Sequence, residues 1–490
     1  MFSEQTAAPG ENGGSQGETL LQATDHDREN VLGRTLDWPA MPAPYKSYAA
    51  DVPTVPLPRP ASWPEAACGE IFCGAEAAPS RPDAATVSTL LQLACGITAS
   101  VRRALDEYHL RADASAGALY PCELYLAARG TAGLPDGLFA FAPERHALRL
   151  LRPGEVLAGQ GLRAWLTVIP FRNAWKYRSR ALRYLFLDSG HVLENLCGAA
   201  RSLGLACSVT RPADPPAVAD LLCVDPAREH CVAEIALGSG CPTLAESLPA
   251  PGSPHLPRAS AVSPREKAYE LVHQALDLPG MNPADAAAPG ETATPIRSIP
   301  ALSLPFAQAV LKRRSRRAYT LSQLPAGALA ALTEALCGPA GPDCGLGLRL
   351  LVQNCPDRPD GVWLLDRSQG DTRGELTRLS GENEDAPHAR LASAALGQAW
   401  MAKAGVLVCF SADVPAAERT FGPGALPQLL LQAGRLGQRV YLAAEALGVG
   451  ACGVGAFYDQ EAAAALGLDA AQGQGERLLY VVAFGPTAGH

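Results

Sequence analysis

The sequence predicts two α+β domains in tandem that pack against each other as a pseudo-dimer within one chain. Residues 188–207 and 432–452 read alike, so one helical segment occurs twice. An apolar run that ends in glycine follows each copy, at 231–238 and 478–485, and such runs are typical of buried strands. Helices alternating with such strands indicate a layered α+β or α/β domain, present once in each half.

Glycines fix the alignment of the two copies. Gly190 and Gly434 stand near the start of each repeated segment, and Gly204 and Gly448 close it at the same spacing. The two copies of a duplicated domain can pack against each other as two subunits would. A ligand site that two subunits normally share is then assembled once, from unlike halves.

Composition divides the chain into four parts. Residues 1–24 are rich in Gly, Glu, Gln and Ser and are expected to be disordered. The first domain is expected over 25–243 and the second over 301–490. Residues 244–300 between them are rich in Pro and Ala and predict a linker, with a short helical pattern near 265–276.

The composition also excludes several classes of protein. A net charge of −8 argues against a nucleic-acid-binding protein, which needs a basic face. We see no signal peptide and no apolar run long enough for a membrane span, so we expect a cytoplasmic protein without a membrane partner. The 14 cysteines include no C-x-x-C pair. Because no matching Cys or His pair follows Cys68 and Cys73, we expect no metal site.

The first copy contains a loop that the second copy lacks. The interval from Gly96 to Gly137 is longer than its counterpart from Gly338 to Gly361, and the additional residues correspond to Arg111–Pro121. Small side chains in this loop let backbone N–H groups approach a planar or anionic ligand closely. The alternative is an ordinary connection between a helix and a strand.

The second copy carries a cluster of cations that the first copy lacks. Residues 312–317 hold five Lys and Arg side chains and one Ser. Arg offers a phosphate a planar fork of donors, and the hydroxyl adds one more donor. The alternatives are a solvated basic stretch or a weak nucleic-acid patch, although such a cluster in an acidic protein needs a local reason.

These two segments resemble a known family of flavoproteins. Arg313-Arg314-Ser315-x-Arg317-x-Tyr319 is similar to the R-R-S-x-R-x-F signature of nitroreductase-fold proteins. Ser115–Pro121, followed by Glu123-Leu-Tyr125, resembles the S-A-G-A-L-Y-P-x-E-x-Y motif of SagB/ThcOx-type dehydrogenases. Those enzymes act in the biosynthesis of thiazole- and oxazole-modified peptides.

Further motifs extend the resemblance along the chain. Trp175-Lys176-Tyr177-Arg178, Arg183-Tyr184 and Gly190-His191 resemble the K-Y and G-H motifs of the same branch. The likeness covers most of residues 26–240 and, more thinly, 301–490. The segment Arg367–Asp385 resembles nothing that we can assign.

The resemblance implies a fold and a cofactor. Nitroreductase-fold proteins are typically homodimers, with a central mixed or antiparallel sheet flanked by helices in each subunit and FMN at the interface. One composite FMN site per chain would follow, with its mirror-image site lost. Arg313 and Ser315 would contact the FMN phosphate within the strip that also holds Arg314, and Arg317 would face the flavin pyrimidine edge. The other cofactor-binding residues implied are Ser115, Ala116, Gly117, Gly453 and Gly455.

The resemblance also implies a reaction. Lys176 and Tyr177 would supply acid and base chemistry while an azoline ring in a peptide is oxidised by hydride transfer to FMN. A lysine serves as a base only if its pKa is lowered toward neutrality, which partial burial and nearby arginines favour. His191 is expected to be structural.

Two other functions stay open on the sequence. One is an NAD(P)H-dependent nitro- or quinone-reductase, which would not depend on Lys176. The other is a non-catalytic flavin-binding or scaffold subunit of a peptide-modifying complex. The partner expected in every case is a peptide or small-molecule substrate, and a cyclodehydratase complex would accompany azoline oxidation.

Overall fold

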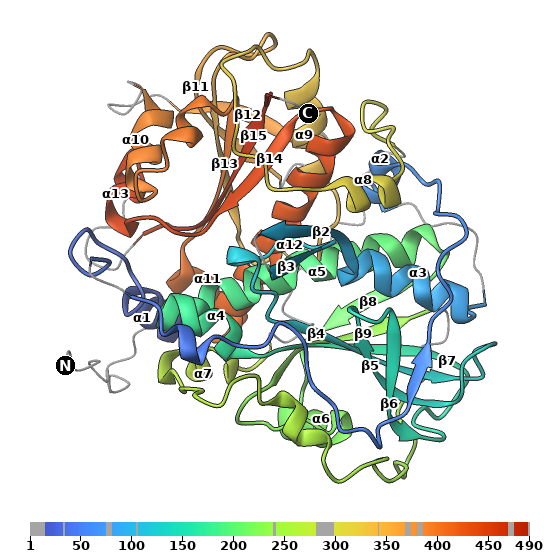
Figure 1. The fold of residues 1–490 in the computed structure, drawn as a ribbon. Coiled ribbons are helices and arrows are strands. Elements are labelled where there is room, and N and C mark those ends of the chain that lie inside the picture. Colours follow the sequence, from blue (N-terminus) through green and yellow to red (C-terminus); the bar gives the residue numbers. More distant parts are fainter. Residues whose placement is uncertain are drawn as a thin grey trace.

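The fold was analysed in a computed structural model of the chain. The residues that it describes are 15–32, 35–74, 81–103, 106–238, 242–280, 298–341, 343–367, 374–379, 386–468 and 475–488. The two halves of the chain form two sheets with helices packed between and around them, and this confirms the predicted α+β fold (Figure 1).

The N-terminal half contains a seven-stranded sheet in the order β1-β6-β5-β4-β7-β9-β8. All pairings among its described strands are antiparallel. The central strand β4 is buried along almost its whole length because helices and loops cover both faces of the sheet. The strands are β1 Thr54–Pro56, β4 Cys122–Arg129, β5 Gly137–Ala142, β6 Ala147–Pro153, β7 Gly161–Val168, β8 Cys207–Thr210 and β9 His230–Leu237.

The C-terminal half repeats this topology with one strand fewer. Its six-stranded sheet has the order β12-β11-β10-β13-β15-β14, which matches the first sheet once β1 is left out. The predicted strands at 231–238 and 478–485 are β9 and β15, and they occupy equivalent places in the two sheets. The strands are β10 Gly347–Val352, β11 Gly361–Asp366, β12 Glu375–Leu379, β13 Val406–Ala412, β14 Gly450–Val454 and β15 Arg477–Gly485.

The helices follow the same repeat. Helix α3 answers α9, α4 answers α11, α5 answers α12, and α6 answers α13, each at the same place in the order of elements. None of the helices in the described part of the chain is both long enough and apolar enough to cross a membrane. The helices are α1 Gln16–Gln22, α2 Cys68–Phe72, α3 Ala84–Cys95, α4 Pro170–Tyr177, α5 Ala181–Ser202, α6 Pro215–Leu222, α7 Glu270–Leu276, α8 Phe306–Lys312, α9 Ala328–Cys337, α10 Pro387–Ala394, α11 Val414–Phe421, α12 Ala425–Ala446 and α13 Asp459–Ala465.

The long helices α5 and α12 cross each other between the two sheets (Figure 1). Their backbones touch at Gly190 and Gly434, the two glycines that align the repeat. A Cβ atom added to Gly190 would lie 2.8 Å from the Cα atom of Gly434, and one added to Gly434 would lie 3.0 Å from that of Gly190. Only glycine allows so close an approach, so the repeated glycines mark the centre of an intrachain pseudo-dimer.

The first half contains two elements that have no counterpart in the second. Between α3 and β4 lie a hairpin of β2 Ile97–Arg103 and β3 Asp106–Arg111, and a 3-10 turn at Ala116–Ala118. In the second half, α9 leads to β10 through a short connection. The interval that the sequence predicted to be longer therefore holds both the hairpin and the small-residue loop.

The N-terminal segment differs from its predicted disorder. Ser15 caps helix α1 by accepting a hydrogen bond from the backbone N–H of Glu18 at 3.1 Å, and Leu20 and Leu21 are buried. Residues 1–14 lie outside the described residues. The prediction of disorder is wrong for α1, because two leucines in a polar stretch pack this short helix against the second half.

The structure describes only part of the segment between the halves. Helix α7 lies within the interval that the sequence predicted to be helical. Residues 281–297 lie outside the described residues, as do 368–373 and 380–385 of the unassigned segment 367–385. The strand β12 lies between these last two stretches and forms the edge of the second sheet.

Candidate active site between the two halves

Seven of the predicted cofactor-binding residues line one cavity between the two halves. Its volume is about 80 Å³. The first half contributes the loop and helix α5, and the second half contributes the cationic strip, helix α12, and strands β14 and β15. We call it the tyrosine cavity, because Tyr184, Tyr441 and Tyr480 also line it. The seven residues are Ser115, Ala116, Gly117, Ser315, Arg317, Gly453 and Gly455.

Asp188 on helix α5 holds the small-residue loop in place. Its carboxylate accepts hydrogen bonds from the Ser115 hydroxyl at 2.7 Å and from the Ala116 backbone N–H at 3.1 Å. Gly117 then adopts φ +65°, a left-handed conformation that favours glycine. Burial raises the pKa of Asp188 to about 7, although the hydrogen bonds from Ser115 and Ala116 oppose this. The sequence reasoning missed Asp188, whose position opening the first repeated segment was the available signal.

Lys176 and Tyr177 end helix α4 directly beside this loop. A Cβ atom at Gly117 would lie 2.6 Å from the Tyr177 hydroxyl and 3.1 Å from the Lys176 Nζ atom. Partial burial and the nearby charge of Arg317 lower the pKa of Lys176. Burial raises the pKa of Tyr177 above its ordinary value. The two predicted catalytic side chains therefore lie beside the tyrosine cavity, although they do not line its enclosed part.

The first arginine of the cationic strip is turned toward the protein. Arg313 is only 4% exposed, and its guanidinium donates to the carbonyl oxygens of Ala112 at 2.8 Å and Arg111 at 3.0 Å. It also lies over the ring of Tyr441. Arg313 thus fastens the second half to the backbone just before the small-residue loop, and it does not line the cavity.

The next two residues of the strip contact different strands, Ser315 contacting β14 and Arg314 contacting β2. Ser315 bridges Ala451 of β14 through the backbone, and its hydroxyl lies 3.0 Å from the hydroxyl of Tyr441. Arg314 donates to the hydroxyl and the carbonyl oxygen of Thr98, each at 3.2 Å. Like Arg313, Arg314 does not line the cavity.

Arg317 is the exposed cation of the site. It lines the cavity and lies over the ring of Trp400, with 5.8 Å between its Cζ atom and the ring centroid. Among the described residues, no carboxylate lies within ion-pair distance of Arg317 or Lys176. Two cations without an acidic partner at one cleft of an acidic protein favour an anionic or electron-rich ligand.

The glycines of β14 and the following turn are packed against tyrosines. A Cβ atom at Gly453 would overlap with the hydroxyl of Tyr480, and one at Gly455 would overlap with the ring of Tyr184. Larger residues would therefore push these rings away. The glycines allow close approach as expected, but the nearest atoms on their side-chain face belong to tyrosines.

His191 is part of a buried polar network. Its ring nitrogens lie 2.7 Å from the side-chain oxygen of Gln438 and 3.1 Å from the hydroxyl of Tyr480. Burial lowers the pKa of His191 to about 4, although the hydrogen bond to Gln438 opposes this, so the ring is neutral near pH 7. Its contacts join α5 to α12 and β15, in agreement with the expected structural role.

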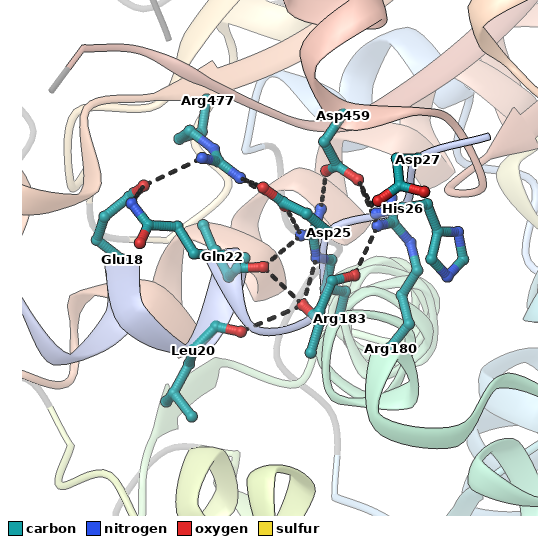
Figure 2. A network of polar contacts seen from close by, with 12 residues as sticks. Glu18, Leu20, Gln22, Asp25, His26, Asp27, Arg180, Arg183, Asp459 and Arg477 are labelled. Carbon is teal, nitrogen blue, oxygen red and sulfur yellow. Dashed lines mark hydrogen bonds and ion pairs between the residues drawn. The ribbon is translucent and has the colours of Figure 1, made fainter. Parts of the chain in front are cut away.

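A second network of polar contacts joins the start of α5 to the second half and to the N-terminal segment (Figure 2). Arg180 at the start of α5 donates to the carbonyl oxygen of Gly455 at 3.1 Å and pairs with Asp459 at 2.6 Å. Arg183 pairs with Asp459 at 2.6 Å and with Asp25 of the N-terminal segment at 2.8 Å. No pattern in the sequence marks this network, because its members lie far apart along the chain.

The residues of the tyrosine cavity fit a flavin in their chemistry and less well in volume. Arg317 and Ser315 offer donors at one side, and the Gly117 backbone offers a flat face at the other. The enclosed volume of about 80 Å³ is below the roughly 300 Å³ at which ligand pockets usually begin. A flavin ring would lie in the open part of the cleft or displace tyrosine side chains.

The fold and the site define an α+β protein in which two copies of one domain pack against each other within one chain, with a cleft between them. The nitroreductase family matches residues 77–239 and 310–486, so the chain belongs to this family and contains two copies of its domain.

Individual relatives agree with this assignment. A crystal structure of an Anabaena variabilis nitroreductase aligns with a TM-score of 0.72 at 22% identity, over 97% of this chain and 100% of that chain. It shows that the tandem fold is shared. A Methanocaldococcus jannaschii protein, MJ1384, which carries the name nitroreductase, is 33% identical over 132 residues, or 24% of this chain. The match spans 63% of the length of that relative.

A chain of the E. coli microcin synthetase McbBCD complex, solved with truncated pro-MccB17 bound, aligns with a TM-score of 0.29. The identity is 21%, over 34% of this chain and 66% of that chain.

Proposed function

We propose that this chain is an FMN-dependent dehydrogenase of the SagB/ThcOx type that oxidises azoline rings in a peptide. Membership of the nitroreductase family supports an oxidoreductase. One observation carries the finer proposal: Lys176 and Tyr177 approach the position of a Gly117 Cβ atom to 3.1 Å and 2.6 Å, at a cleft that the cationic strip closes from the other half.

In this proposal Lys176 removes a proton from the substrate ring. Partial burial and the charge of Arg317 lower the pKa of Lys176, so a larger fraction of the amine is neutral and able to accept a proton. Burial raises the pKa of Tyr177, so its hydroxyl keeps its proton and can donate a hydrogen bond to the substrate. FMN, when bound, supplies the hydride acceptor.

The remaining residues orient the reactants. Ser315 and Arg317 would hold the flavin from the second half, while Ser115, Ala116 and Gly117 face it from the first. Arg313 keeps its bonds to the carbonyl oxygens of residues 111 and 112 and so fixes the distance between strip and loop. Oxygen or another acceptor would regenerate the flavin, and a cyclodehydratase would supply the azoline.

The first experiment measures flavin in the purified protein. The absorbance spectrum, together with the flavin released on denaturation, gives the amount of FMN per chain. We expect one FMN per chain, because only one half carries the small-residue loop and only the other carries the cationic strip.

The second experiment compares Lys176→Met with Lys267→Met, which removes an exposed lysine distant from the cleft in sequence. Removing a general base typically costs about 10²- to 10⁴-fold in rate. We expect this loss in azoline oxidation by Lys176→Met with FMN content unchanged, and no loss by Lys267→Met. Equal oxidation by both variants would contradict the role of Lys176. Flavin that NAD(P)H reduces equally well in both would indicate a nitro- or quinone-reductase instead.

The small cavity favours one second candidate, a non-catalytic scaffold subunit of a peptide-modifying complex. Three tyrosines line the tyrosine cavity and leave little free volume in it, and Arg313 is committed to backbone carbonyls. Protein without flavin, or with flavin that turns over no substrate, would support this candidate and exclude the dehydrogenase.

A further inference from the structure

A second cavity lies at the position related to the tyrosine cavity by the internal repeat. Its volume is about 920 Å³, near the upper end of the range for ligand pockets. We call it the arginine cavity, because Arg163, Arg201, Arg211 and Arg435 line it. Four of its lining residues are counterparts of residues that line the tyrosine cavity. Aligned on Gly190 and Gly434, Leu431 corresponds to Leu187, Arg435 to His191 and Cys197 to Tyr441; aligned on Gly238 and Gly485, Ala233 corresponds to Tyr480.

The size difference follows from these substitutions. Tyr441 and Tyr480 project large rings into the tyrosine cavity, whereas Cys197 and Ala233 leave the equivalent space open. The sequence predicted that the mirror-image site is lost. The small-residue loop is indeed missing there, yet the space between the halves is larger than in the retained copy.

Two cysteines meet in the wall of the arginine cavity. The sulfur atoms of Cys197 on α5 and Cys207 at the start of β8 are 3.4 Å apart, and both thiols are free. A disulfide bond is about 2.05 Å long, so a sulfur displacement of roughly 1.4 Å would join them. Cys197 is buried, and Cys207 is partly exposed.

Two arginines lie close to this pair of thiols. The Nη1 atom of Arg201 is buried and has no hydrogen-bond partner among the described residues. Arg435 pairs with Glu194 at 3.0 Å and also lies close enough to favour a thiolate on Cys197. The hydrogen bond from Cys207, together with the charges of Arg435 and Arg201, lowers the pKa of Cys197. A lowered pKa in an electropositive cavity is the setting of a reactive thiol.

The far part of the cavity is cationic as well. Arg211 makes only long contacts, at 3.4 Å and 3.3 Å, to the carbonyl oxygens of Pro279 and Leu276, and burial lowers its pKa to about 10. No carboxylate among the described residues lies within ion-pair distance of it. The acidic groups that line the cavity are Glu234, which pairs with Arg163 at 2.7 Å, and Asp277. A buried cation that has no carboxylate partner favours an anionic ligand.

We propose that the arginine cavity is a thiol–disulfide exchange site for a small anionic disulfide. The thiolate of Cys197 attacks one sulfur of the ligand, so a Cys197–ligand bond forms, the ligand disulfide breaks, and one ligand thiolate leaves. Cys207 then loses its proton to solvent and attacks Cys197, which releases the second ligand thiolate. The protein dithiol is oxidised by two electrons and the ligand disulfide is reduced to two thiols.

This proposal does not depend on the flavin. The proposal rests on the thiol pair and the volume of the arginine cavity, and on Arg201 and Arg211, which have no carboxylate partner among the described residues. The ligand class follows from charge, since Arg201 and Arg211 attract carboxylates, whereas a neutral disulfide gains nothing from them.

The test uses the full-length reduced protein and oxidised glutathione as the anionic probe. We expect rapid formation of a Cys197–Cys207 disulfide, seen by peptide mass spectrometry under non-reducing conditions. Cys207→Ser should stop at a stable glutathione adduct on Cys197, and Cys197→Ser should prevent disulfide formation. Cys355→Ser removes a partly buried cysteine elsewhere and should leave the reaction unchanged.

The neutral probe 2-hydroxyethyl disulfide separates ligand recognition from thiol reactivity. Arg211→Gln should slow oxidation by glutathione disulfide by about threefold or more and affect the neutral probe much less. Arg211 is not among the charges that lower the pKa of Cys197, so only the charged ligand loses an attractive partner. An absent Cys197–Cys207 disulfide in the unmodified protein would overturn the exchange reaction. Equal slowing of both probes by Arg211→Gln would overturn the assignment of an anionic ligand.

Discussion

Replacing Gly434 with alanine tests whether the two halves meet backbone to backbone. The added Cβ atom would overlap with the carbonyl oxygen of Leu187 and lie 3.0 Å from the Cα atom of Gly190. Both neighbours belong to the backbone of α5, so the helices must separate. Overpacking of this kind costs about 1–3 kcal/mol, while the higher helix propensity of alanine returns up to about 1 kcal/mol. We therefore expect a net loss of roughly 1–2 kcal/mol in the free energy of unfolding.

The assay is urea unfolding, with Gly437→Ala on the same helix as the control. The nearest atom to a Cβ at Gly437 is on the ring edge of Tyr480, at 2.7 Å, and a side chain beside a cavity can move where a backbone cannot. Gly434→Ala should therefore lower the unfolding free energy more than Gly437→Ala does. If Gly434→Ala is as stable as the unmodified protein, the close crossing of α5 and α12 is wrong.

Three further predictions concern buried carboxylates. Burial would raise the pKa of Glu194, but Arg439 and Arg435 on α12 lower this pKa from its ordinary 4.5 to about 2. The unfolding free energy should therefore fall as the pH drops from about 4.5 to 2. Glu194→Gln should flatten that slope in acid unfolding curves. The pKa of Asp188 is raised from 3.8 to about 7, chiefly by burial, so stability should fall as the pH rises from about 4 to 7, and Asp188→Asn should abolish this fall. Asp459→Asn leaves the buried Arg180 without a carboxylate partner among the described residues and Arg183 with Asp25 alone, at a cost of about 3–5 kcal/mol, and should speed limited proteolysis of residues 15–32.

The sequence predicted the parts of this molecule that depend on repeated residue patterns. The paired glycines aligned the two copies, and the glycine-bounded apolar runs located β9 and β15; the structure adds that Gly190 and Gly434 meet where the central helices cross. The small-residue loop and the cationic strip were expected to face each other, and Ser115 and Ser315 do line one cavity. Each of these signals is local, so a single sequence carries it.

Other features depended on contacts between distant residues and were not predictable. The direction of the Arg313 side chain is set by two carbonyl oxygens in the other half, at residues 111 and 112. Arginines in a strip all look alike in the sequence, whether they face a ligand or the protein. The volume of each cavity likewise depends on which side chains converge from both halves, so neither the narrow nor the wide space could be inferred.

Buried ion pairs hold the two halves of the duplicated chain together. Glu194 on α5 accepts from Arg435 at 3.0 Å and from Arg439 at 2.6 Å, both on α12. Separating the halves would leave these charges without partners in each half, unless water replaced every contact. In a homodimer such a pair would occur twice by symmetry. Here the equivalent of Glu194 on α12 is Gln438, which instead bonds Asn195 at 2.8 Å. The charged pairing therefore holds only one face of the crossing, the face toward the arginine cavity that Arg435 lines. Divergence of the two copies has therefore made the contact between them asymmetric, and the two cavities beside it differ in volume and in the residues that line them.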